Sequence, residues 1–182
     1  VCSLDQDTAG ITEFLRAAQP ELTSGHDVWL PVVRTPKTIL SPCRAIGPAF
    51  RPIKEANALP RSFSAINSGL IGRLPILGDL GFDESLFLDY VDHDLIRRAR
   101  SKGVRFSLLN TVELSQDFSR ETDDLNSAVA RFKIFRTDVL EFYKGTPYTR
   151  WYPVLLSTWT ALMLARQHRS IRALRDLLGA GS

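Results

Sequence analysis

Two Asp-x-Asp triplets, Asp5-Gln6-Asp7 and Asp92-His93-Asp94, are the residues best suited to chemistry. Carboxylates two positions apart in an extended segment lie on one side of the backbone, where they can hold a hard divalent cation that in turn binds a diphosphate. Such a triplet arises by chance in roughly half of chains this long. Its position therefore matters more than its presence, and the first triplet directly follows the strand-like apolar run Val1–Leu4.

One interpretation of the first triplet is a phosphatase. Asp5-Gln6-Asp7-Thr8 after a strand resembles the first motif of haloacid-dehalogenase-like phosphatases, in which Asp5 would be the nucleophile and Asp7 the acid/base. Residues 78–83, Gly-Asp-Leu-Gly-Phe-Asp, are similar to the last, metal-binding motif of that family. The middle fits less well, because Lys54 lies in a proline-flanked stretch that does not look helical. The phosphatase remains the alternative function.

A longer set of matches resembles the family-two inverting glycosyltransferases of the rhamnosyltransferase type. The first triplet is similar to their DQD motif, and residues 67–71 (Asn-Ser-Gly-Leu-Ile) resemble their SSG-x-(I/L) segment. Residues 80–92 (LGFDESLFLDYVD) match the pattern G-G-(F/M)-D-E-x-L-F-I-D-Y-V-D almost residue for residue. The resemblance covers about residues 1–110 in order, and its most specific block runs from Gly81 to Gly103.

This resemblance implies an enzyme that moves a rhamnose-like sugar from a nucleotide-diphosphate donor to a saccharide or lipid-linked acceptor, with inversion. Such activity belongs to polysaccharide biosynthesis at the cell envelope. The implied fold is α/β, the GT-A type of nucleotide-diphospho-sugar transferases. The family's first strands, which bind the nucleotide, would precede Val1, so we expect an incomplete domain that is inactive or weakly active by itself.

The resemblance also implies roles for the motif residues. An inverting transferase needs a base to deprotonate the acceptor hydroxyl, and Asp92 matches that position at an expected helix start, where the helix dipole favours a carboxylate. It also needs a cation, Mg²⁺ or Mn²⁺, to stabilise the departing nucleoside diphosphate. Asp7 would be the main metal ligand, and Asp5 would lie nearer the ribose or the waters of the metal.

The other implied contacts are with the donor and the acceptor. Ser68 and Gly69 would bring the backbone close to the sugar or phosphate, and Asp83 and Glu84 would shape the acceptor side. Arg98 would either reach a phosphate or pair with a buried acid.

The sequence departs from the family on the metal side. Family members often carry a His after the strand that follows the catalytic helix, whereas this chain has Gln116, a weaker ligand, followed by Asp117. The chain's own histidines do not look like ligands, and His93 is expected at the exposed start of a helix.

The elements that must position these residues follow from periodicity and breakers. We expect strands at 1–4, 27–33 and 104–109, helices at 11–18, 92–102, 129–143 and 152–178, and a proline-rich surface loop at 34–61. This order predicts an α/β catalytic part over residues 1–126 and a helical appendage over 127–182.

Composition narrows the partners. Two cysteines without zinc or disulfide spacing favour a reducing, cytoplasmic setting. The longest apolar run, residues 152–165, is shorter than the roughly 20 residues of a membrane span. Trp151, Tyr152 and Trp159, with the arginines that follow, either pack on the domain or dock peripherally on the inner face of a membrane. Without aromatic residues among those arginines, the basic end does not predict nucleic-acid binding.

Overall fold

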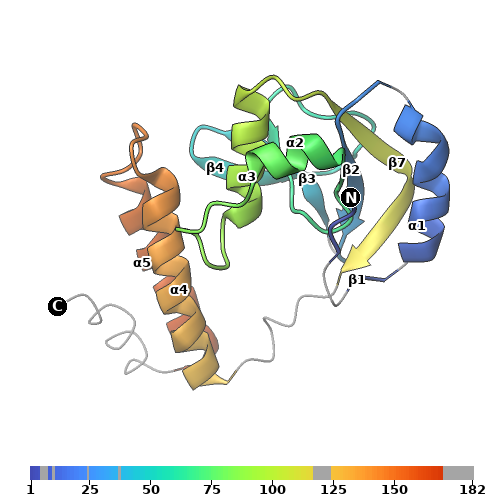
Figure 1. Cartoon of the computed structure of the whole chain (residues 1–182). Coiled ribbons are helices and arrows are strands. Elements are labelled where there is room, and N and C mark those ends of the chain that lie inside the picture. The colour runs from blue at the N-terminus through green and yellow to red at the C-terminus, as the bar shows by residue number, and fades with distance from the viewer. Residues whose placement is uncertain (5–7, 10, 24, 37, 117–123, 170–182) are drawn as a thin grey trace. The chain divides into compact units, whose positions relative to one another are not determined.

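The computed structural model describes residues 1–4, 8–9, 11–23, 25–36, 38–116 and 124–169 (Figure 1). Its contacts divide the chain into two compact units. The first, here called the sheet unit, is Val1–Phe82 with Asp92–Phe118, and the second, here called the helical unit, is Asp83–Val91 with Ser119–Ser182. The predicted boundary after residue 126 assigns residues 83–91 to the catalytic part, whereas the contacts group them with the C-terminal helices.

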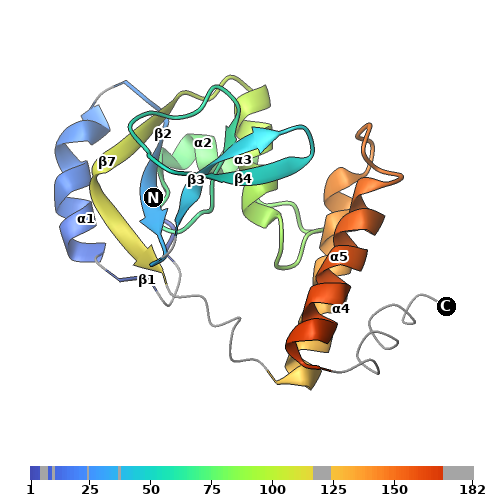
Figure 2. The same ribbon diagram turned by 180° about the vertical axis from the view of Figure 1, so that it is seen from behind.

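The sheet unit is built on a seven-stranded mixed sheet, which is also visible from behind in Figure 2. Its strands are β1 (Thr8–Ala9), β2 (Val28–Arg34), β3 (Ile39–Ile46), β4 (Ala49–Ile53), β5 (Phe63–Ser64), β6 (Ile71–Gly72) and β7 (Phe106–Gln116). The main order is β1-β7-β2-β3-β4, with β5 paired to β3 and β6 paired to β2. Only the β2–β7 pairing is parallel among the described strands.

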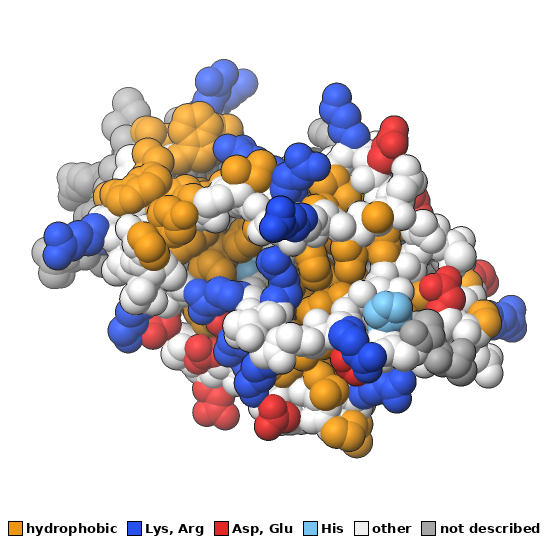
Figure 3. Space-filling view, turned by 90° about the horizontal axis from the view of Figure 1, so that it is seen from above, with side chains coloured by type: hydrophobic (Ala, Val, Ile, Leu, Met, Phe, Trp, Pro, Cys, Tyr) orange, Lys and Arg blue, Asp and Glu red, His pale blue; other side chains and the backbone are white. Residues whose placement is uncertain are grey.

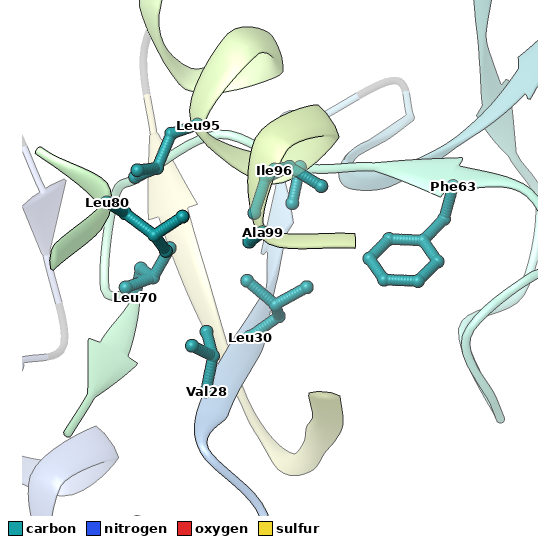
Figure 4. Close-up of a cluster of buried hydrophobic side chains, with 9 residues drawn as sticks. Val28, Leu30, Phe63, Leu70, Leu80, Leu95, Ile96 and Ala99 are labelled. Carbon is teal, nitrogen blue, oxygen red and sulfur yellow. The ribbon is translucent and has the colours of Figure 1, made fainter. Parts of the chain in front are cut away.

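Helices cover both faces of this sheet, and β2 is therefore buried on both sides. The helices are α1 (Ile11–Ala18), continued by a 3₁₀ turn at Gln19–Thr23, α2 (Leu74–Leu80) and α3 (Val91–Ser101). Successive side chains of a strand point to opposite faces. Val28 and Leu30 pack with α2 and α3 in one cluster (Figure 4), and Trp29 and Val33 pack with α1 in the other.

The helical unit contains α4 (Leu125–Tyr143) and α5 (Tyr152–Gln167). Asp124 caps α4, because its carboxylate accepts the backbone N–H groups of Asn126 and Ser127 at 2.8 and 2.9 Å. Phe132 and Ala161 form the buried contact between the two helices. Within the described residues, no helix is both long and apolar enough to cross a lipid bilayer.

Most predicted elements are confirmed, and together they establish a mixed α/β fold with C-terminal helices. The helix at 11–18 is found as predicted, and the predicted helix at 92–102 and strand at 27–33 are each displaced by one residue. The predicted strand at 1–4 is reduced to a single bridge between Cys2 and Ile71.

The predicted surface loop at 34–61 is wrong, because it contains the hairpin of β3 and β4. Its prolines hide these strands from sequence analysis. Pro42 falls where the β3–β4 register is irregular, and Pro52 lies in β4 at the end of the main strand order. Irregular and edge positions are the places where a strand tolerates proline, since the missing N–H is not needed there.

Candidate functional site

Asp92 and Asp94 occupy the first turn of α3 in different environments. Asp94 is buried and pairs with Arg97 and Arg98, each with an N–O distance of 2.6 Å. Asp92 is only half-buried, and it lies where the N-terminal end of the helix dipole favours an ionised carboxylate. Asp94 therefore serves the structure, and Asp92 is the more accessible acid of this triplet.

Arg98 is engaged by the protein itself. Besides Asp94, its guanidinium donates to the backbone carbonyl oxygens of Leu80 and Gly81, the latter at 2.9 Å. All three guanidinium nitrogens therefore have partners, which favours pairing with a buried acid over binding a phosphate. These bonds also attach α3 to the end of α2.

His93 is largely buried, so the expectation of an exposed histidine is wrong. Its Nδ1 shares a 2.7 Å hydrogen bond with the Ser64 hydroxyl, and its ring stacks on Phe50 with the centroids 3.9 Å apart. Burial lowers the pKa of His93 to about 4, so the imidazole is neutral at physiological pH. The residue next to Asp92 thus fixes the start of α3 against β4 and β5.

Ser68 and Gly69 lie in a tightly packed segment of the sheet unit. Ser68 is fully buried, and Gly69 has a φ of +74°. The Gly69 N–H donates to the Ser3 carbonyl at 2.7 Å, and the Ser3 N–H donates to the Leu70 carbonyl at 2.9 Å. The close backbone approach predicted here is made with the protein's own chain, and contact with a sugar or phosphate stays a prediction.

The predicted metal ligands Asp5 and Asp7 lie outside the described residues, but the chain on both sides of them is anchored. Ser3 is bonded to the 69–70 segment, and Thr8 pairs with Gln116 at the end of β7. Gln116, which replaces the expected histidine, is therefore opposite the residue that follows Asp7. Among the described residues, no cluster of three His, Cys, Asp or Glu side chains is suited to a metal ion.

Asp83 and Glu84 are exposed in the helical unit. The Asp83 carboxylate accepts the backbone N–H of Ser85 at 3.0 Å and its hydroxyl at 2.6 Å, so it shapes a local turn. Asp79, in the segment that resembles the phosphatase motif, is exposed and pairs with Lys102 at 2.9 Å. Contact of Asp83 and Glu84 with an acceptor stays a prediction.

Sequence analysis missed Asp138 of α4, which holds the segment just before Asp92. This buried carboxylate accepts the backbone N–H groups of residues 87, 88 and 89 at 3.0, 2.8 and 2.7 Å. Tyr90 follows with a φ of +66°, and its ring packs 4.8 Å from that of Phe142. The detectable signal is spacing, since Asp138 falls on the same apolar stripe of α4 as Phe135 and Phe142.

Sequence analysis also missed a cavity of about 150 Å³ within the helical unit. Phe132 and Phe135 form part of its wall, and Asp89, Arg131 and His168 add polar groups. It therefore combines aromatic surface with groups of both charge types.

Comparisons with protein-family models, curated proteins and solved structures found no match to this chain. The sheet and the helices described above therefore show a mixed α/β fold, and the chemistry of the site has to be inferred from its own residues.

Proposed function

We propose that this chain carries the acceptor-side, catalytic part of an inverting glycosyltransferase of the rhamnosyltransferase type, with a GT-A fold. The observation that carries the proposal is the environment of Asp92. This carboxylate stands at the start of α3 and is the last residue of the block 80–92 that resembles the family, while Asp94 is engaged in buried ion pairs.

Asp92 would act as the general base. It takes the proton of the acceptor hydroxyl while that oxygen forms a bond to the anomeric carbon of the donor sugar. The bond from this carbon to the diphosphate breaks on the opposite face, and the nucleoside diphosphate leaves with the electron pair. One such displacement inverts the anomeric configuration.

Asp7, with Asp5, would hold Mg²⁺ or Mn²⁺, which would supply positive charge to the leaving diphosphate. The support for this assignment is the resemblance of the triplet to the family's DQD motif. The acceptor would be a saccharide, free or lipid-linked, and Ser68, Gly69, Asp83 and Glu84 are the proposed contact residues.

The test uses the complete natural protein that contains this sequence. It is incubated with a panel of nucleotide-diphosphate sugars, rhamnose-like donors included, and saccharide acceptors, with Mg²⁺, with Mn²⁺ or with EDTA. We expect one donor to be consumed only with metal, and NMR of the product to show an inverted anomeric centre. If no donor is consumed under any condition, the proposal fails.

Substitution separates the role of Asp92 from a general effect of removing acids. Asp92→Asn should lower kcat by about 10²–10⁴-fold and leave the KM for the donor nearly unchanged, because a general base acts mainly in the transition state. Asp79→Asn, which removes an exposed carboxylate paired with Lys102, is the control and should keep full activity. Release of phosphate from a simple phosphate ester, abolished by Asp5→Asn, would instead support the phosphatase.

A further inference from the structure

The outer face of α5 is apolar and exposed. Trp159 is 62% exposed and Trp151, just before the helix, is 51% exposed. Four further large apolar side chains on this side are about half exposed or more: Val154, Leu155, Leu162 and Met163. Val154, Leu155 and Trp159 follow Trp151 by three, four and eight residues, and Leu162 and Met163 follow Trp159 by three and four. This helical spacing places all six residues on one side of α5, here called the outer stripe. Of the three aromatic residues predicted either to pack on the domain or to face a membrane, Tyr152 packs against Tyr143, whereas more than half of Trp151 and of Trp159 is exposed.

The opposite face of α5 is already used. Pro153, Ser157 and Ala161 are buried, and Ala161 packs against Phe132 of α4. A helix that is apolar on both sides needs apolar surroundings on both sides. The outer stripe is thus a surface that a partner should cover.

Charge identifies the kind of partner. Residues 142–175 contain six Lys or Arg and no Asp or Glu. Arg150 and Arg166 lie exposed near the two ends of α5, and Figure 3 shows Lys and Arg side chains beside the hydrophobic surface. A second copy of this face would bring like charges together, whereas an anionic surface would neutralise them.

We infer that the outer stripe docks on a membrane surface that contains anionic lipids, with α5 lying in the plane of the interface. Tryptophan side chains favour the headgroup level, and flanking arginines are attracted to anionic headgroups. The inference rests on α5 and its charges, and it holds whether or not the chain transfers sugars.

The test is co-sedimentation of the 182-residue chain with vesicles of phosphatidylcholine alone or mixed with phosphatidylglycerol. We expect binding to the mixed vesicles and little to the neutral ones. The double variant Trp159→Ser with Leu155→Ser should lose roughly tenfold or more in partitioning, because it removes two large apolar contacts. Leu74→Ser is the control, since Leu74 is a leucine of the sheet unit that is 67% exposed, compared with 58% for Leu155.

Charge and fluorescence provide independent readouts. Arg150→Glu with Arg166→Glu should weaken binding to mixed vesicles by about tenfold or more at low salt. Arg51→Glu, at an exposed arginine of β4 in the sheet unit, should change binding less. The tryptophan emission should shift to the blue on binding, because Trp151 and Trp159 enter the interface while the third tryptophan, Trp29, is already buried.

Failure to bind mixed vesicles, or equal binding to neutral ones, would overturn the inference. A concentration-dependent dimer in analytical ultracentrifugation that the serine variant dissolves, without vesicle binding, would show that a second copy covers the stripe instead. Circular dichroism of each variant separates loss of binding from loss of fold.

Discussion

Three adjacent residues at the start of α3 have three different environments. Asp94 is buried in ion pairs, the ring of His93 stacks on Phe50 of β4, and Asp92 remains partly accessible. A helix turns by about 100° per residue, so neighbours in sequence point in different directions. The position proposed for the base is therefore followed by two residues that fix the first turn of α3.

His93 should make stability depend on pH. Its pKa is about 4 in the folded chain and about 6.5 when unfolded, so the unfolded chain binds more protons between these values. The contribution of His93 is complete above pH 6.5 and is lost as the pH falls to 4. The full difference amounts to about 3 kcal/mol. Urea unfolding of the wild type and of His93→Gln across this range measures it.

The variant lacks the titrating ring, so its free energy of unfolding should fall less steeply between pH 6.5 and 4. The other titratable groups are present in both proteins, so their effects cancel when one free energy of unfolding is subtracted from the other. Parallel curves for the two proteins would show that the imidazole is not held neutral by burial.

At the scale of elements, the segment before β6 connects parts of the sheet unit that are distant in sequence. The backbone N–H of Gly69 donates a hydrogen bond to the carbonyl of Ser3. A Cβ on Gly69 would lie 2.4 Å from the Leu114 side chain of β7. The glycine is therefore needed both for its positive φ and for the close approach of β7.

Gly69→Ala should destabilise the sheet unit more than Gly25→Ala does. Both glycines have a positive φ, +74° and +76°, so both substitutions carry a similar backbone cost. Nothing lies within 4 Å of a Cβ on Gly25, whereas alanine at Gly69 must displace Leu114 and Pro31. We expect an additional loss of about 1–3 kcal/mol for Gly69→Ala, measured by urea unfolding. Equal losses for the two variants would contradict this packing.

Sequence analysis predicts elements well where periodicity and burial agree. The helix at α3 was predicted with its inward residues Leu95, Ile96 and Ala99, because one side of it is clearly apolar. The prediction failed at β3 and β4, whose prolines are tolerated only by an irregular register and an edge position. The register and the position at the edge depend on which strands pair, and local sequence does not reveal that. The burial of His93 was missed for the same reason, since Ser64 and Phe50 are distant in sequence.

At the scale of the whole molecule, the chain leaves the sheet unit after Phe82, joins the helical unit, and returns at Asp92. The excursion at 83–91 is held by Asp138 of α4, more than forty residues later. The helical unit is therefore completed by a segment that lies, in sequence, inside the sheet unit. The block that most resembles the glycosyltransferases spans this crossing.

Asp138→Asn should accordingly destabilise the helical unit and spare the sheet unit. An amide has a single oxygen and presents N–H groups of its own, so part of the bonding to residues 87–89 is lost in a buried place. We expect a loss of about 2–3 kcal/mol and faster proteolysis within residues 83–91.

Glu141→Gln is the control, because it makes the same change of charge on α4 but breaks only a pair with exposed Lys144. Hydrogen exchange resolves the two units, with α4 and α5 expected to lose protection and β2 and β7 to keep it. A uniform loss in both units would mean that they unfold as one, and unchanged protection in α4 would mean that Asp138 does not hold the excursion.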